Sequence, residues 1–297
     1  MSGTEAPDPR FVEIGQWPTV DAVTAMIDGQ ADAIAAIRKQ TKAIAVAADA
    51  AAAVLKGRGR LCYAGAGTSG RVAVQDGVEL GPTFGWPAER LVYLMAGGMD
   101  ALAHSAEGAE DDADAARADV SANGIGAGDV LIGVAASGRT RFTIGAVEAA
   151  RSVGALTISI ANNPDTPLLV AADYAICIDT GSELIAGSTR MKAGTAQKAV
   201  LNTLSTAIML RLGRVHHGLM VDMVISNEKL MRRATGMIQT LTGCSETIAM
   251  NALELSGRDI KTAVLVAMGQ LPASAVVLLA SHQGMLPDAI AAMKAAA

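Results

Sequence analysis

Aromatic side chains are scarce in this sequence, because three phenylalanines, three tyrosines and two tryptophans make up only 3% of its 297 residues. So few rings leave few platforms on which nucleic-acid bases could stack. Hydrophobic residues nevertheless account for 51% of the chain and charged residues for 18%, which is typical of a globular protein with a large core. We therefore expect a core of small aliphatic side chains carried by many helices.

Basic clusters and paired cysteines are also missing. The formal net charge is -5 and the lysines and arginines are scattered, which argues against nucleic acid or a membrane surface as a partner. Cys62, Cys177 and Cys244 are far apart and odd in number, so we expect reduced structural thiols in a cytoplasmic protein. No metal-ligand spacing joins them to the four histidines, and we expect no metal site.

Leader segments and uninterrupted membrane-spanning runs are not evident either. The first residues, MSGTEAPDPRFVEIGQ, hold acids and prolines where a signal peptide has a basic start and an apolar stretch. Residues 262–280 carry no charge, but Gly269, Gln270 and Pro272 interrupt them. This pattern predicts two short buried helices rather than a membrane span.

Hydrophobic periodicity divides the chain into three segments. Residues 1–56 have helical spacing, residues 57–227 alternate β-rich runs with helical stretches, and residues 228–297 form a small helical C-terminal domain. The β-rich runs are RLCYAG, RLVYLMAGG, DVLIGVAAS, ALTISIA and YAICID. Their alternation with helices predicts an α/β fold with a central parallel sheet.

Three loops rich in hydroxyl groups follow predicted strands and open predicted helices. They are GAGTSGR, AASGRTR and GSTRMK, and the helices are expected to begin near Ser69, Thr140 and Ser188. The first loop also matches the dinucleotide pattern G-x-G-x-x-G, but no acidic residue closes the second strand, RLVYLMAGG, as that site requires.

A phosphate site explains all three loops together, although each hydroxyl alone could be a simple helix cap. Backbone N-H groups and hydroxyls at helix N-termini bind a tetrahedral anion, and the carboxyl ends of parallel strands meet at one edge of a sheet. The candidate substrate-binding residues of the loops are Gly67, Thr68, Ser69, Arg71, Ser137, Gly138, Thr140, Ser188, Thr189 and Lys192.

Four glutamates near these loops are candidates for acid-base or sugar-binding roles, with a solvated side chain as the alternative. Glu79 stands in an apolar stretch, where a carboxyl keeps its proton more readily and suits a general acid. Glu107 and Glu110 lie among small residues in EGAE, and Glu183 precedes the third loop and is expected to bind sugar hydroxyls.

The position of Glu79 along its helix raises a geometric question. An unbroken helix from Ser69 would place Glu79 about 15 Å from the helix N-terminus. Three solutions remain open: Gly77 breaks the helix, the second and third loops hold the phosphate, or Glu79 reaches a site in a partner subunit. We favour a site shared at the interface.

These motifs together make the chain similar to the SIS (sugar isomerase) superfamily and, within it, to the N-acetylmuramic acid 6-phosphate etherase family. The resemblance runs from about Gly57 to Asn251 and is carried by GAGTSGR, PTFG, LMAGG, EGAEDD, ASGRT, GSTRMKAGTAQK, LMVDM and SNEKL. It implies an αβα sandwich, with the SIS phosphosugar-binding domain at residues 57–227, and a homodimer with its site near the subunit interface.

The resemblance also implies an activity: cleavage of the D-lactyl ether of a sugar phosphate, N-acetylmuramic acid 6-phosphate, without metal or redox cofactor. By motif, the catalytic acid falls on Glu79 and the second functional carboxylate on Glu110. Leu80 and Gly81 stand where the family usually has Cys-Pro, and DPRFVEIGQWPTVDAV replaces its usual opening segment.

Two other functions fit the same loops. An aldose-ketose phosphosugar isomerase also moves the C2 proton but needs no acid for a leaving group, so Glu79 separates it from an etherase. A non-catalytic phosphosugar-binding regulator would need neither glutamate.

Overall fold

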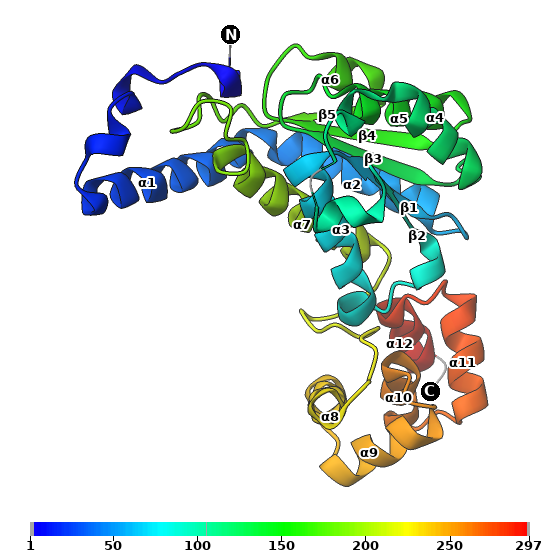
Figure 1. The fold of residues 1–297 in the computed structure, drawn as a ribbon. Coiled ribbons are helices and arrows are strands. Elements are labelled where there is room, and N and C mark those ends of the chain that lie inside the picture. Colours follow the sequence, from blue (N-terminus) through cyan, green and yellow to red (C-terminus); the bar gives the residue numbers. More distant parts are fainter. Residues whose placement is uncertain (1–2, 105, 296–297) are drawn as a thin grey trace. The chain divides into compact units, whose positions relative to one another are not determined.

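The computed structural model describes residues 3–104 and 106–295, which form two compact units. The first comprises Met1–Val78 and Ala88–Ile208, and the second comprises Glu79–Pro87 and Met209–Ala297 (Figure 1). These units do not coincide with the three segments expected from the sequence: the boundary at residue 57 falls inside the first unit, and the second unit begins before residue 228. The division into three domains stays a prediction, because a compact unit need not fold separately.

A five-stranded parallel sheet lies at the centre of the first unit, in the order β2-β1-β3-β4-β5. All five predicted strands are confirmed, and the predicted α/β fold class with them. The central strands β1 and β3 are buried at every position and β4 at all but its first, as a parallel sheet between helices requires. Their bounds are Leu61–Gly65 (β1), Leu91–Met95 (β2), Val130–Ala135 (β3), Leu156–Ala161 (β4) and Tyr174–Cys177 (β5).

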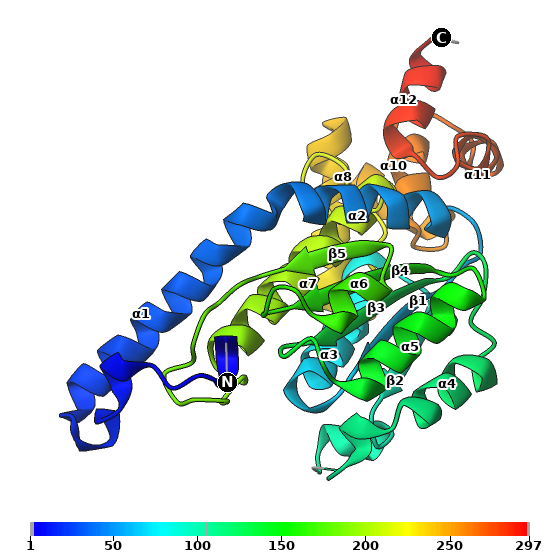
Figure 2. The same ribbon diagram turned by 90° about the horizontal axis from the view of Figure 1, so that it is seen from above.

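Helices cover both faces of this sheet (Figures 1 and 2). On one face Cys62, Ala64 and Leu131 pack in one core cluster with Phe142 and Ala146. That face carries α4 (Ala113–Ala122), α5 (Arg141–Ser152) and α6 (Pro167–Ala171). The other face carries α2 (Thr41–Leu55), α3 (Gly67–Phe84) and α7 (Lys192–Arg211), and α1 (Thr19–Ile37) precedes them.

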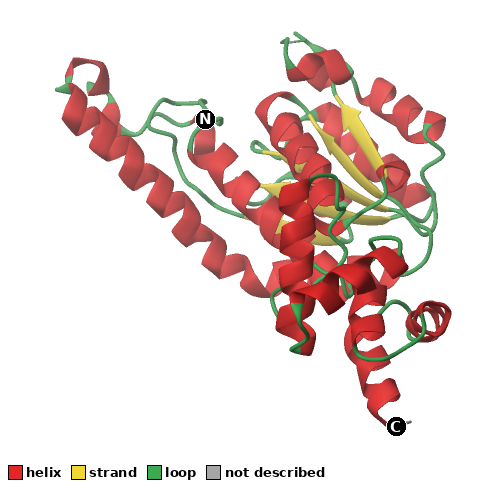
Figure 3. Ribbon diagram, turned by 90° about the horizontal axis from the view of Figure 1, so that it is seen from below, coloured by secondary structure: helices red, strands yellow, loops and turns green. Residues whose placement is uncertain are grey.

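Short 3-10 helices precede or connect these elements. Figure 3 shows helices, strands and loops in different colours. They are η1 (Gly3–Glu5), η2 (Pro9–Phe11), η3 (Ile14–Gln16), η4 (Arg38–Gln40), η5 (Ala88–Arg90), η6 (Met99–Leu102) and η7 (Ala109–Asp111).

Helix α3 runs through Gly77 without a break, so a break at that residue is excluded. The reason for the glycine is close packing against the sheet. A Cβ atom at this position would lie 2.6 Å from Cε1 of Tyr93 and 2.9 Å from Cε2 of Tyr63. Gly77 therefore lets the helix approach the tyrosines of β1 and β2.

A buried carboxylate ties α3 to α7 beneath the sheet. The Tyr63 hydroxyl donates to Asp76 Oδ2 at 2.9 Å, and Asn202 Nδ2 and the Ser205 hydroxyl donate to Asp76 Oδ1 at 2.7 and 3.0 Å. Burial raises the pKa of Asp76, although these hydrogen bonds oppose the shift. The three donors satisfy a polar group that would otherwise be costly to bury.

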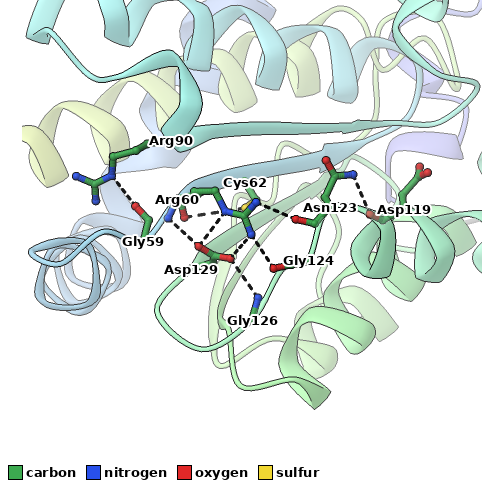
Figure 4. A network of polar contacts seen from close by, with 9 residues as sticks. All are labelled: Gly59, Arg60, Cys62, Arg90, Asp119, Asn123, Gly124, Gly126 and Asp129. Carbon is green, nitrogen blue, oxygen red and sulfur yellow. Dashed lines mark hydrogen bonds and ion pairs between the residues drawn. The ribbon is translucent and has the colours of Figure 1, made fainter.

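Charged residues also fasten the amino edge of the sheet (Figure 4). Arg60, just before β1, pairs with Asp129, just before β3, at 2.7 Å. The Asp129 carboxylate also accepts hydrogen bonds from the backbone N-H groups of Arg60 and Gly126. Arg90, just before β2, donates to the carbonyl of Gly59 at 2.7 Å. These bonds hold the strand starts in register.

The second unit is helical after residue 227, as the sequence predicts. It holds α8 (Glu228–Thr242), α9 (Glu246–Leu255), α10 (Ile260–Ala267), α11 (Pro272–Ser281) and α12 (Leu286–Ala295), which share one apolar core. Helices α10 and α11 are the two short helices predicted for the uncharged run, and they meet at a bend of 118°. Within the described residues no single helix meets the length and hydropathy of a membrane span, and this bent pair meets them only together.

Candidate functional site

The first and second hydroxyl loops leave the sheet from neighbouring strands. Strands β1 and β3 are paired in parallel, with Gly65 opposite Val134. The chain continues from β1 to β2 on one side of this pair and from β3 to β4 on the other side, so the direction in which strands are added to the sheet reverses between β1 and β3. Ligands of open α/β sheets bind outside the carboxyl ends of strands at such a reversal. The predicted meeting of these two loops at one edge is confirmed.

The third hydroxyl loop lies against the first. A Cβ atom on Gly194, in the first turn of α7, would be 3.3 Å from Cγ2 of Thr68. The N-H of Gly194 donates to the carbonyl of Thr189 at 2.8 Å. The hydroxyl loops around Thr68 and Thr189 are therefore neighbours, although 121 positions separate these residues in the sequence (189 − 68).

No side chain of the second hydroxyl loop caps the N-terminus of α5. Thr140 occupies the cap position, but its hydroxyl makes no capping hydrogen bond. The Ser137 hydroxyl oxygen accepts the N-H of Arg139 at 3.1 Å. Gly138 has φ +64°, and a Cβ there would meet Thr166 Oγ1 at 2.2 Å. This loop can offer its hydroxyls and the first amides of α5 to an anion.

The third loop differs, because the N-terminus of α7 already holds an anion. The fully buried Glu183 accepts the N-H of Lys192 with Oε2 and the N-H of Ala193 with Oε1, both at 2.9 Å. This cap explains why α7 begins at Lys192 and not near Ser188. The predicted sugar contact of Glu183 stays a prediction, and the observed role of this fully buried side chain is to cap α7.

Lys192 also has a structural role. Its side chain is 7% exposed, and Nζ donates to the carbonyl of Ser182 at 3.0 Å. The ammonium group therefore supports the turn before α7, and its predicted phosphate contact stays a prediction. Ser188 and Thr189 remain half-buried beside the first loop.

A first pocket gathers four predicted residues beside the ends of β1 and β2. It measures about 290 Å³, and its lining includes Gly67, Arg71, Glu107 and Glu110. Arg71 donates from Nε to the carbonyl of Leu102 at 3.0 Å, which fixes its guanidinium group. Both glutamates are exposed. The pocket thus places two carboxylates near a fixed positive charge.

A second pocket lies beside the ends of the other strands. It measures about 430 Å³ and contains Ser137 of the second loop. Arg139 of the same loop also lines the pocket, and the other lining residues were not among the predicted ligands: Gly3, Glu5, Asn163, Pro164, Asp165 and Asp179. The polar stretch NNPD directly after ALTISIA could have indicated some of them, because it also follows a strand at the carboxyl edge.

Glu79 is exposed and belongs to the second unit, next to Val78 at 56% exposure. The apolar surroundings predicted for its carboxyl are therefore not provided by the described part of this single chain. Arg214 fixes the end of the same helix, because its Nη1 donates to the carbonyls of Phe84 and Gly85 at 2.9 and 3.0 Å. Its guanidinium carbon lies 5.4 Å from the ring centroid of Trp86.

An ion cluster extends this anchor into the helical unit. Lys261 Nζ lies 2.5 Å from Asp222 Oδ2, and Arg214 Nε lies 3.9 Å from the same atom. Burial raises the pKa of Asp222, and the charge of Lys261 opposes that shift. Within the second unit, these charged groups thus hold the C-terminal turn of α3.

Models of SIS domains and of a lid domain match most of the chain. Residues 42–151 match the glucokinase regulatory protein N-terminal SIS domain, and residues 110–207 match the SIS domain. Residues 217–295 match the C-terminal lid domain of glucokinase regulatory protein. A solved structure of a candidate phosphosugar isomerase from Bacteroides fragilis shares the fold, with TM-score 0.51 and 20% identity over 68% of this chain and 99% of that one.

Curated relatives match nearly the whole chain at higher identity. N-acetylmuramic acid 6-phosphate etherase of Deinococcus radiodurans is 47% identical over 263 residues, covering 89% of this chain and 86% of the relative. The enzyme of the same name from Streptomyces coelicolor is 46% identical over 290 residues, covering 97% and 93%. This chain belongs to the N-acetylmuramic acid 6-phosphate etherase family.

Proposed function

We propose that this protein cleaves the D-lactyl ether of N-acetylmuramic acid 6-phosphate and releases N-acetylglucosamine 6-phosphate and D-lactate. Its relatives carry that activity in their names. The structural observation that carries the proposal is the first pocket, in which Glu107 and Glu110 lie beside Gly67 and Arg71 at the carboxyl edge of the sheet.

Acid-base chemistry by two carboxylates accounts for the bond that breaks. An ether oxygen at C3 leaves as a strongly basic alkoxide, so it needs a proton from an acid. Opening of the sugar ring exposes the C1 aldehyde, which makes the C2 proton acidic enough for a carboxylate base. Elimination then forms a C2-C3 double bond, and water adds to C3 while C2 regains a proton.

We assign removal of the C2 proton to Glu110 and protonation of the lactate oxygen to Glu79. Glu110 lines the pocket, and Glu79 is exposed on α3. Each positioned acid or base contributes about 10²- to 10⁴-fold to the rate.

The phosphate is assigned mainly to the second loop. The N-terminus of α5 lacks a side-chain cap, whereas the Glu183 carboxylate would repel an anion at the N-terminus of α7. Ser137, Gly138 and Thr140 would therefore hold the phosphate, with hydroxyls from the first and third loops completing the site. Binding energy from this remote group orients C2 and C3 for reaction.

We further propose that a second copy of the chain covers α1 and supplies Glu79 to the neighbouring site. Val20, Val23, Ile27 and Ile34 recur at helical spacing along α1, and each is 45% to 71% exposed. Apolar side chains so exposed along one helix favour association with a partner. Glu79 would gain its apolar surroundings from this association.

Nuclear magnetic resonance in deuterated water tests the reaction. Wild-type protein should release D-lactate from N-acetylmuramic acid 6-phosphate and leave one deuteron at C2 of the product. Glu79→Gln should lose lactate release, Glu110→Gln should lose both lactate release and labelling, and the exposed Glu89→Gln should match wild type. Absence of lactate would contradict the proposal, and C2 exchange on another hexose phosphate would favour an isomerase.

Mixed dimers test the shared site. Glu79→Gln and Glu110→Gln chains are each expected to be inactive alone. Random mixing of the two should restore about a quarter of wild-type activity if each site takes Glu79 from its partner, because half of the dimers then contain one complete site. Sites built within one chain would give no recovery.

A further inference from the structure

The N-terminal 3-10 helix η1, Gly3–Glu5, is fastened to the carboxyl edge of the sheet (Figure 2). Thr4 is fully buried. Its N-H donates to Asn163 Oδ1 at 3.0 Å, and Asn163 Nδ2 donates to the Thr4 hydroxyl oxygen at 2.9 Å. The Thr4 carbonyl accepts the N-H of Gly187 at 3.0 Å. The segment is therefore attached to the loop after β4 and to the turn before α7.

The same asparagine reaches the second hydroxyl loop. Asn163 Nδ2 also donates to the carbonyl of Ala136 at 2.9 Å, and Ala136 directly precedes Ser137. Thr4 is thus connected through one side chain to the backbone of the loop that we assign to the phosphate. A substitution at Thr4 should therefore shift the position of Ser137.

Backbone conformation shows how closely the segment fits. Gly3 has φ +59°, and a Cβ atom there would lie 1.6 Å from Asn163 Oδ1. Glu5, at the other end of the segment, lies close to the turn before α7, because a Cβ on Gly187 would be 3.0 Å from Glu5 Oε2. Only glycine leaves room at the first position, and the Glu5 carboxylate lies close to Gly187 and lines the second pocket.

We propose that this segment completes the sugar-phosphate site, with Thr4 and Asn163 as positioning residues and Glu5 as a substrate-binding residue. This inference rests on the proposed function and extends it. The second pocket is lined by Gly3, Glu5 and Asn163 together with Ser137 and Arg139. The N-terminal segment and the second hydroxyl loop thus line the same cavity.

The charges in this pocket determine which part of the ligand lies where. Ser137 and Arg139 supply donors and a positive charge, which suits the phosphate. Glu5, Asp165 and Asp179 would repel an anion, but their oxygens accept hydrogen bonds from neutral donors. The hydroxyl groups at C4 and C5 of an opened hexose 6-phosphate are such donors and lie next to the phosphate. They should therefore face Glu5, while C2 and C3 extend toward Glu110.

Calorimetric titration of the full chain tests the role of Glu5. Glu5→Gln should weaken binding of N-acetylglucosamine 6-phosphate by about 10- to 100-fold, the effect of one hydrogen bond to a charged acceptor. Binding of inorganic phosphate should stay within about twofold, because a lone phosphate does not reach Glu5. Glu13→Gln, exposed on the same N-terminal stretch, serves as control. Equal sugar-phosphate affinity of Glu5→Gln and wild type would overturn the assignment.

A second variant separates positioning from direct contact. Thr4→Val keeps the size of the side chain and removes its hydroxyl, so it should weaken binding of inorganic phosphate and of the sugar phosphate alike. Melting temperatures of both variants check that the fold persists. Unchanged phosphate affinity in a folded Thr4→Val protein would overturn the positioning role.

The binding measurements also separate this inference from the proposed function. If wild type binds hexose phosphates and Glu5→Gln binds them weakly, but neither releases lactate, the site assignment stands and the etherase activity fails. If wild type releases lactate and Glu5→Gln equals it in both KM and affinity, only the inference fails. A wild-type chain that binds no hexose phosphate contradicts both.

Discussion

The two edges of the central sheet differ in how their polar groups are paired. At the amino edge the charged residues are satisfied within the chain: Arg60 pairs with Asp129, and Asp173 accepts the Thr157 hydroxyl at 2.7 Å. At the carboxyl edge Glu107 and Glu110 are exposed in a pocket, and the N-terminus of α5 has no side-chain cap. One edge holds the strands together, and the other keeps polar groups for a ligand.

Removing a carboxylate from the carboxyl edge should have the largest effect of all, and only on activity. Glu110→Gln is expected to lower kcat by about 10²- to 10⁴-fold, because a positioned acid-base group is lost. The midpoint of urea unfolding should stay at the wild-type value, since the side chain is exposed. Steady-state lactate release measures kcat, and urea titration measures the unfolding midpoint. A stable variant with full activity would remove Glu110 from the mechanism.

Removing a carboxylate from the amino edge should lower stability and leave activity unchanged. Asp129→Ala leaves Arg60 and two backbone N-H groups without their acceptor, so the free energy of unfolding should fall by about 2–4 kcal/mol. The kcat of the folded fraction should be unchanged. Asp114→Ala, which removes only an exposed ion pair with Arg117, is the matched control and should unfold like wild type. Loss of kcat without loss of stability would contradict the comparison.

The amino edge should also make stability depend on acid. Burial alone would raise the pKa of Asp129, but hydrogen bonds and the charge of Arg60 lower it overall. Because the folded pKa lies below the unfolded value of about 3.9, this stabilisation is fully present above pH 4 and is lost as the pH falls through the folded pKa. Urea unfolding of wild type should weaken below about pH 4, and Asp129→Ala should show a flatter dependence. Parallel curves would contradict this explanation.

Glu183 tests whether the N-terminus of α7 is structural. Glu183→Gln replaces one acceptor of the cap by a donor that faces backbone N-H groups. The free energy of unfolding should fall by about 1–2 kcal/mol, with no loss of affinity for inorganic phosphate. Tighter phosphate binding in this variant would instead indicate that α7 holds the phosphate and that the native carboxylate opposes it.

Thr140 gives the smallest expected effect, again at the carboxyl edge. Thr140→Val removes one hydroxyl from the second loop and should weaken sugar-phosphate binding by about 2- to 12-fold, the value of one ordinary hydrogen bond. Ser152→Ala, at the other end of α5, controls for changes to the helix. Calorimetry on both variants measures the difference. Equal affinities would move the phosphate away from α5.

Much of this arrangement follows from sequence pattern. The five β-rich runs alternate with helices, and each one forms a strand. Parallel strands bring the loops after β1 and β3 to one edge of the sheet, so the placement of both loops at that edge could be expected. Local patterns suffice here, because strand burial and loop order do not depend on distant contacts.

Other parts of the site depend on contacts that no local pattern reveals. Thr4 and Asn163 are 159 residues apart and meet only in the folded chain. Glu183 looks like a ligand for sugar hydroxyls, yet it caps a helix that begins nine residues later. A hydroxyl or carboxylate near a helix start has the same sequence signature whether it serves the backbone or a ligand.

Hydrogen-deuterium exchange with and without N-acetylglucosamine 6-phosphate tests the difference between the edges most directly. We predict protection of residues 66–71, 106–111 and 137–143, and none at residues 56–60 and 123–129. Protection at residues 3–8 would accompany it if the N-terminal segment belongs to the site. Protection confined to the amino edge, or none at all at saturating ligand, would contradict the central claim that the carboxyl edge binds the substrate.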